Sequence, residues 1–126
     1  MMMWAAIGAG GAAGAMARYA MAGAVTRLIG PNFPWGTLAV NVLGGLVMGL
    51  LVGIMAAKWS PSAEMRAFLT TGLLGGFTTF SAFSLEAWLL IERHDYGAAA
   101  FYIAASVLLS IGALALGLYL VRVMSA

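Results

Sequence analysis

The stretch TTGLLGGFTTFSAFSLE, residues 70–86, decides the fold, because it lies within a hydrophobic segment yet differs from a plain membrane span. Two adjacent glycines, Gly75 and Gly76, interrupt it, hydroxyl side chains follow, and the carboxylate of Glu86 closes it. In hydrocarbon, a backbone amide freed by a helix break costs several kcal/mol unless protein or water satisfies it. We therefore expect a discontinuous helix, broken at the glycine pair, whose break faces an ion, a substrate or a buried interface.

The composition around this stretch is that of a membrane protein. The chain has 126 residues, of which 63% are hydrophobic and 8% are charged, whereas soluble domains carry about 25% charged residues. The lipid bilayer is therefore the first expected partner. The chain has no cysteine and one histidine, which argues against disulfides and thiolate or imidazole metal centres. A net charge of +2 is too small for a nucleic-acid partner. The sequence contains neither a nucleophile beside a base nor a phosphate-binding loop, so we do not expect an enzyme.

Hydropathy and turn residues predict a single all-α transmembrane domain over residues 1–126, with both termini on one side of the membrane. Four spans are expected, at residues 2–24, 36–57, 65–91 and 96–124. The first has no basic signal-peptide region and continues past signal-peptide length, so we expect it to be retained. Proline and glycine mark a loop at residues 25–35, and Pro61 with Ser62 as a helix cap marks the next. The third span is longer than the roughly 20 residues a bilayer requires, which favours a broken helix.

Small and polar residues repeat every four positions, which places them on one face of a helix. Gly10 and Gly14 form such a pair in the first span. The stripe of the second span consists of Thr37, Asn41, Gly45, Gly49 and Gly53. The glycines predict close packing against a neighbouring helix. The amide of Asn41 instead requires a polar partner at bilayer depth.

Further polar side chains extend this pattern into the third and fourth spans. The whole set is Thr37, Asn41, Thr78, Thr79, Ser81, Ser84, Tyr102, Ser106 and Ser110. A single hydroxyl in a membrane most often joins two helices, contributing about 0.6 kcal/mol. Because the members align in three spans, the set as a whole predicts a polar track.

Several residues near the break allow two interpretations. Phe80 and Phe83 share a helix face, either as ordinary packing aromatics or with the positive ring edges lining an anion path. The carbonyls of the break could hold a small hard cation, or the glycines could simply provide a kink or a packing slot. Glu86 fits a proton-coupling carboxylate, a cation ligand or an interfacial residue, and Arg18 fits an anion attractor or a snorkelling residue.

The basic residues are balanced between the two sides of the membrane. Lys58, Arg66 and Arg122 fall on the side of the termini, and Arg18, Arg27 and Arg93 on the other. The positive-inside rule then gives no preferred orientation. This balance predicts dual topology and an antiparallel homodimer.

With these stretches in view, the chain resembles the Fluc (also called CrcB) family of microbial fluoride channels over its whole length. The resemblance rests on four motifs: GAMARY at residues 14–19, GTLAVNVLGG at 36–45, GGFTTFSAFSLE at 75–86, and the stripe Tyr102, Ser106, Ser110. It departs at Ala82, where family members often carry a hydroxyl side chain.

The resemblance implies a dual-topology homodimer in a bacterial inner membrane, with two antiparallel pores that export fluoride passively and give fluoride resistance. It also implies a structural sodium ion at the dimer interface, held by the main-chain carbonyls of Gly75 and Thr78, and a vestibule arginine at Arg18. The expected pore residues are Thr37, Asn41, Thr79, Phe80, Ser81, Phe83, Glu86, Tyr102, Ser106 and Ser110.

Three rival functions remain open at this point. A small multidrug-resistance-type proton antiporter would also have four spans, but requires a carboxylate at the centre of the first span, where this chain has only Arg18. A proton-coupled fluoride carrier would use Glu86 as its coupling group. A structural helper subunit would need no polar track and predicts tolerance of Asn41→Ala.

Overall fold

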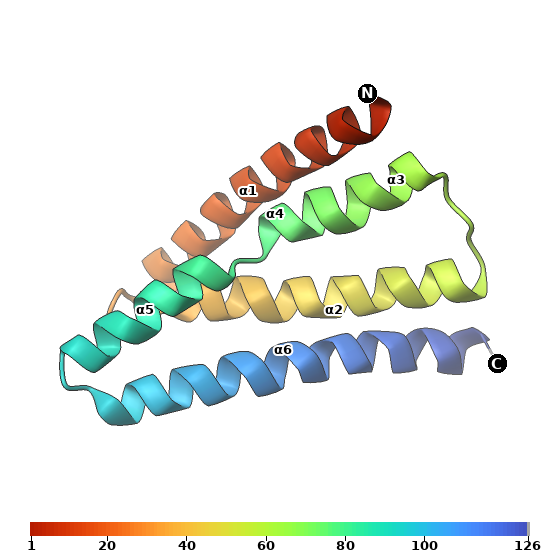
Figure 1. Ribbon diagram of the computed structural model, residues 1–126. Coiled ribbons are helices and arrows are strands. Elements are labelled where there is room, and N and C mark those ends of the chain that lie inside the picture. The colour runs from red at the N-terminus through yellow and green to blue at the C-terminus, as the bar shows by residue number, and fades with distance from the viewer. Residues whose placement is uncertain (126) are drawn as a thin grey trace.

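The computed structural model describes residues 1–125, and all elements in this range are helical. In order, they are α1 (Met2–Ile29), α2 (Trp35–Ala57), α3 (Ala63–Ala67), η1 (Phe68–Leu74), α4 (Gly75–Phe77), α5 (Phe80–Glu92) and α6 (Tyr96–Ser125). The elements from α3 to α5 follow one another as a single discontinuous rod, and the N- and C-termini lie at the same end of the molecule (Figure 1). The predicted all-α class and the shared side of the termini agree with this arrangement.

Three of these helical rods, within residues 1–125, are long and apolar enough to cross a membrane: Trp35–Ala57, Ala63–Glu92 and Tyr96–Ser125. The 28-residue helix α1 has the length but falls outside this group, since alanine and glycine dominate it and Arg18 and Arg27 interrupt it. Three of the predicted spans are thus supported, and the membrane crossing of α1 stays a prediction.

Helix α1 continues beyond the predicted end at residue 24. Its last turn includes Arg27, which was expected in a loop. The helix ends at Ile29 and is followed by Gly30, whose φ of 110° favours glycine. The apolar residues Leu28 and Ile29 continue the helical sequence up to Gly30 and Pro31. As a result Arg18 is well inside the helix rather than near its end.

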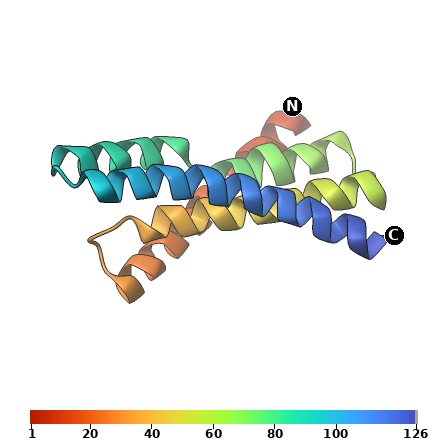
Figure 2. The same ribbon diagram turned by 90° about the horizontal axis from the view of Figure 1, so that it is seen from below.

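Helices α2 and α6 lie side by side in both views (Figures 1 and 2). Their backbones approach closely at glycines: a Cβ on Gly45 would lie 2.6 Å from the carbonyl oxygen of Ser110, and one on Gly117 would lie 2.6 Å from that of Leu46. The predicted packing role of the glycine stripe in the second span is therefore confirmed.

Helix α1 packs in the same way on the first half of the broken rod. A Cβ on Gly10 would lie 2.5 Å from the carbonyl oxygen of Phe68, and one on Gly76 would lie 2.5 Å from that of Gly11. Each contact involves backbone atoms, which cannot move aside. The small residues on both surfaces therefore fix how α1 crosses this rod.

The helix break lies three residues after the predicted position. Gly75 is helical, with φ −62° and ψ −38°, whereas Thr78 (φ −86°, ψ 160°) and Thr79 (φ −151°, ψ 123°) are extended. The prediction of a break at Gly75 and Gly76 was therefore wrong, because Gly76 serves close packing on α1. The π-helix η1 just before the break was not predicted; such segments occur frequently at functional sites.

Ser62 caps the start of the rod, as predicted, since its hydroxyl accepts a hydrogen bond of 3.1 Å from the backbone amide of Met65. Beyond the break, α5 packs on α6 through side chains. The buried cluster at this contact consists of Leu38, Phe83, Ala87, Leu90, Ala99, Tyr102 and Ala105. The break therefore stands between two differently packed halves.

Candidate functional site

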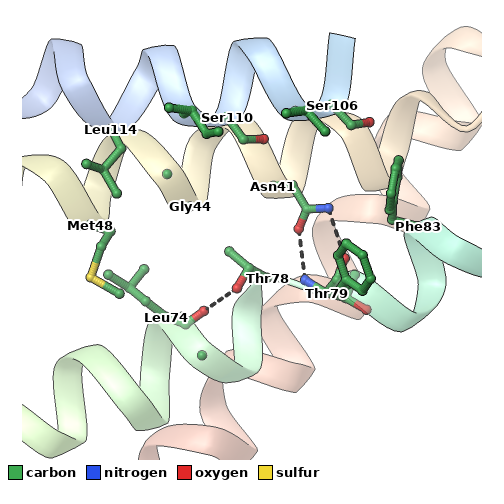
Figure 3. Close-up of a pocket in the computed structure, with 15 residues that line it drawn as sticks. Asn41, Gly44, Met48, Leu74, Thr78, Thr79, Phe83, Ser106, Ser110 and Leu114 are labelled. Atoms are coloured by element: carbon green, nitrogen blue, oxygen red, sulfur yellow. Dashed lines mark hydrogen bonds between the residues drawn. The ribbon is translucent and has the colours of Figure 1, made fainter. Parts of the chain in front are cut away.

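Asn41 satisfies the extended backbone at the break. Its side-chain Nδ2 donates to the carbonyl oxygen of Thr79 at 3.0 Å, and its Oδ1 accepts from the amide of Thr79 at 2.8 Å (Figure 3). The carboxamide thus pairs with both main-chain groups of Thr79, as a neighbouring strand would. The partner that the sequence required for this amide is the break itself.

Arg18 reaches the same break from α1. Its Nε donates to the carbonyl oxygen of Gly76 at 3.1 Å, in a partly buried position. In a continuous helix this carbonyl would accept from the amide four residues later, beyond the extended residues Thr78 and Thr79. Side chains of two different helices therefore bind the carbonyls of Gly76 and Thr79.

A cavity of about 460 Å³ opens beside the break (Figure 3). Its wall includes Asn41 from α2, Phe83 from α5, and Ser106 and Ser110 from α6. The remaining lining residues are Gly44, Gly45, Met48, Leu74, Gly75, Thr78, Thr79, Phe80, Val107, Ile111 and Leu114. None of these side chains carries a formal charge, so the cavity offers dipoles rather than ions.

The two serines of α6 carry the least satisfied polar atoms of this wall. The side-chain oxygens of Ser106 and Ser110 are buried and have no hydrogen-bond partner among residues 1–125. A buried hydroxyl without a partner costs about 1 to 3 kcal/mol, so such groups indicate a missing ion, water or ligand.

The threonine hydroxyls of the break are already engaged. Thr78 Oγ1 donates to the carbonyl oxygen of Leu74 at 2.9 Å, and Thr79 Oγ1 accepts from the amide of Ala82 at 3.1 Å, which caps α5. The hydroxyl hydrogen of Thr78 is therefore used within the helix. The hydroxyl of Thr79 only accepts in its cap and keeps its hydrogen, so it remains an available donor beside the two serines.

The two phenylalanines differ strongly in exposure. Phe83 is 9% exposed and packs on Tyr102 in a tilted arrangement with ring centroids 5.2 Å apart, whereas Phe80 is 78% exposed. Their own centroids are 5.5 Å apart, so both rings line one side of the cavity. Phe83 is positioned by the core, and Phe80 has most of its surface free within the single chain.

A second cavity of about 460 Å³ lies on the other side of Thr79. Arg18, Thr37 and Glu86 line it, and Tyr102 Oη donates to Oε1 of Glu86 at 3.1 Å. Glu86 also lines a smaller cavity of about 260 Å³ that contains Arg93. Most of the residues predicted for the site therefore line two cavities that share Thr79.

Three residues of the predicted polar set line neither of these two cavities. Tyr102 is fully buried and is linked to the second cavity only through its bond to Glu86. Ser81 and Ser84 are exposed on α5 and line neither of the two cavities around Thr79. Ser84 Oγ donates to the carbonyl of Phe80 at 2.9 Å, and the hydroxyl of Ser81 lies 3.4 Å from that of Thr79.

Sequence reasoning missed the contact between Arg18 and Gly76, which are 58 residues apart. It also missed Arg93, which lines the smaller cavity together with Glu86. The spacing of Gly10, Gly14 and Arg18, four apart on the helix face that packs on the rod, was a signal that could have located Arg18.

Comparison with known proteins gives a match over nearly the whole chain. The family model described as "CrcB-like protein, Camphor Resistance (CrcB)" matches residues 5–118. A fluoride-specific ion channel FluC of Rhodospirillum centenum is 52% identical over 122 residues, which cover 97% of each chain. The protein of the same name from Agrobacterium fabrum is 54% identical over 116 residues, covering 92% of this chain and 93% of the relative. That from Phenylobacterium zucineum is 52% identical over 117 residues, covering 92% of both.

Proposed function

The chain belongs to the CrcB family and is a multi-pass bacterial membrane protein, and we propose that it is a fluoride-specific ion channel rather than an enzyme. The observation in the structure that best supports this function is the pair of buried, unpartnered hydroxyls of Ser106 and Ser110, two residues that line the cavity together with Asn41. Fluoride is a small, strongly hydrated anion, so a pore must replace its water with hydrogen-bond donors.

The proposed path runs through the two cavities around the break. Fluoride would enter beside Arg18 and Glu86, pass Thr79 and Asn41, and continue along Phe83 to the serines of α6. The ring edges of the phenylalanines add partial positive charge. No lining residue of the cavity with the serines carries a formal charge, which supports binding weak enough for the ion to leave. Passive export from the cytoplasm would give fluoride resistance.

A structural sodium ion is the proposed cofactor, and the donor set of the break fits it. Arg18 and Asn41 engage the carbonyls of Gly76 and Thr79, and the amide of Thr79 bonds to Asn41 rather than to the carbonyl of Gly75. The carbonyls of Gly75 and Thr78 would be the ligands, since carbonyl oxygens suit a hard cation. The sodium would offset the repulsion between two anion paths.

A second, antiparallel copy is part of the proposal. Two carbonyls of one chain form only part of the coordination shell of a cation. Phe80, Ser81 and Ser84 are exposed on α5, and two hydroxyl side chains are unusual on a surface that contacts lipid. The elements that carry Lys58, Arg66 and Arg122 place them toward the end of the molecule that holds the termini (Figure 1). Arg27 and Arg93 lie toward the other end, and Arg18 lies at the break. This near balance supports dual topology with two pores per dimer.

The test is fluoride efflux from liposomes that contain the purified protein, read with a fluoride electrode beside a chloride measurement. Fast fluoride efflux without comparable chloride efflux, and its loss in Phe80→Ile, would support the channel. Phe101→Ile is the matched control, since Phe101 is 54% exposed and lines neither cavity around the break. No fluoride efflux from well-folded protein would overturn the proposal.

Further efflux measurements test the structural sodium, the pore role of Asn41 and proton coupling separately. Loss of efflux on complete sodium removal supports the structural sodium, and unchanged efflux contradicts it. Undiminished efflux in Asn41→Ala would contradict the pore role of Asn41, whereas acidification of the lumen in step with fluoride movement would favour a proton-coupled carrier.

A further inference from the structure

Arg18 is held against the backbone of the broken rod instead of standing free in its cavity. Gly10, Gly14 and Arg18 are each four residues apart, so they share one face of α1. The glycines bring this face so close that a Cβ on Gly14 would lie 2.8 Å from the amide nitrogen of Phe77. One turn further on, the guanidinium group reaches the carbonyl of Gly76 with its Nε, at 3.1 Å.

The carbonyl that Arg18 binds belongs to the end of a helix. Helix α4 ends at Phe77. The amide of Thr78 still donates to Leu74, but the extended backbone of Thr78 and Thr79 keeps the amide of Phe80 from reaching the carbonyl of Gly76. The last carbonyls of a helix lack intrahelical partners and carry a partial negative charge, which a cation in the last turn stabilises. At bilayer depth these carbonyls need a protein partner, because lipid offers no donor.

We infer that Arg18 is a positioning residue: its Nε–H group caps the first half of the broken rod and holds the backbone of the break. This role differs from attracting anions with its charge. Arg18 and Asn41 engage the carbonyls of Gly76 and Thr79, and no side chain within residues 1–125 binds the neighbouring carbonyls of Gly75, Phe77 and Thr78. The link to transport rests on the proposed channel function.

Two substitutions separate the donor from the charge. In Arg18→Gln, the side-chain amide nitrogen stands at the same position along the chain as Nε of arginine, so a donor remains and the charge is lost. In Arg18→Lys, a methylene group stands at that position, and the ammonium one bond further is compact and strongly hydrated. The charge remains and the Nε donor is lost.

We expect fluoride efflux to be slower in Arg18→Lys than in Arg18→Gln by about tenfold, the size of effect expected when a buried carbonyl loses its hydrogen-bond donor. Arg18→Lys should also need more sodium for half-maximal efflux than Arg18→Gln. Arg27 lines the same cavity and is exposed, so Arg27→Gln and Arg27→Lys report what charge alone contributes there.

Hydrogen–deuterium exchange in detergent gives a readout that does not depend on transport. Peptides covering residues 76–80 should exchange faster in Arg18→Lys than in Arg18→Gln, with the exchange of α2 and α6 unchanged. A wild-type protein without fluoride efflux would overturn the proposed function, whereas this exchange pattern would still decide the role of Arg18.

Faster efflux in Arg18→Lys than in Arg18→Gln, or equal efflux in both, would overturn the inference. If Arg18→Lys does not fold, Arg18→Gln decides alone: efflux greatly below that of Arg27→Gln would show that charge, not the donor, is what Arg18 supplies.

Discussion

The two halves of the broken rod are packed by opposite means. The first half, residues 63–77, lies against α1 through glycine backbones, with Gly72 and Gly76 facing α1. The second half, α5, lies against α6 through rings, with Phe83 on Tyr102. One contact depends on side chains being absent, and the other depends on large side chains being present.

The rod is broken where these two kinds of packing meet. Backbone-to-backbone packing fixes the first half with little freedom, because close-packed main-chain atoms cannot yield. Rings instead set the angle of α5, and they leave a cavity at the joint, where the contacts change from one kind to the other. Asn41 and Arg18 hold the backbone at this joint, so the groups that face the cavity are attached to fixed supports.

The first half should tolerate no added atom at its contact with α1. A Cβ in Gly14→Ala would overlap the carbonyl oxygen of Leu73, so α1 must move away, and we expect a loss of at least about 3 kcal/mol or failure to fold. Gly8→Ala is the matched control, since a Cβ there meets nothing within 4 Å and a helical alanine is favourable. Thermal unfolding in detergent measures both, and equal melting temperatures would contradict the comparison.

The second half should depend on one polar contact within its apolar packing. Tyr102→Phe keeps the buried ring but removes the donor to Oε1 of Glu86, so we expect a loss of about 1 to 3 kcal/mol and slower fluoride efflux. Tyr119→Phe on the same helix, where the side chain is 61% exposed, should change neither quantity appreciably. Equal effects of the two variants would show that the hydroxyl of Tyr102 contributes nothing.

Each half of the rod should lose a small amount of stability when the residue that caps its helix is replaced. Ser62 caps the first half and Thr79 caps α5, each through a 3.1 Å bond, so Ser62→Ala and Thr79→Val should cost about 1 kcal/mol. The loss at Thr79 should be the larger one, because water can replace Ser62 but is scarce at bilayer depth. Ser62→Asp keeps an acceptor and should restore stability. A smaller loss at Thr79 in thermal unfolding would contradict this order.

The helices themselves could be predicted from the sequence, because apolar runs and turn residues act locally. The starts of α2 and α6 lie within one residue of the predicted limits, and the cap at Ser62 was confirmed. The break was misplaced because adjacent glycines fit two roles, flexibility and close approach. Only the position of Gly11 against Gly76 decides between them, and that is a contact between separate helices.

The candidate site could be predicted as a set of residues but not as a network. Ser106 and Ser110 line one cavity, as their four-residue spacing indicated, and their hydroxyls are buried without a partner among residues 1–125. The pairing of Asn41 with Thr79 joins residues 38 apart, so no local pattern reveals it. The same holds for Arg18, for which the sequence left two roles open and the structure adds a third, the cap on Gly76.

The unequal lengths of the paired helices α2 and α6 couple the protein to its lipid. The 30 residues of α6 extend over about 45 Å and the 23 residues of α2 over about 35 Å, whereas the hydrocarbon core of a bilayer is about 30 Å thick. This hydrophobic mismatch is relieved by tilting the helices or by thickening the bilayer around them. Because α6 also carries Ser106 and Ser110, the acyl-chain length of the surrounding lipid acts on the helix that supplies the two free hydroxyls, and thinner membranes should tilt it further.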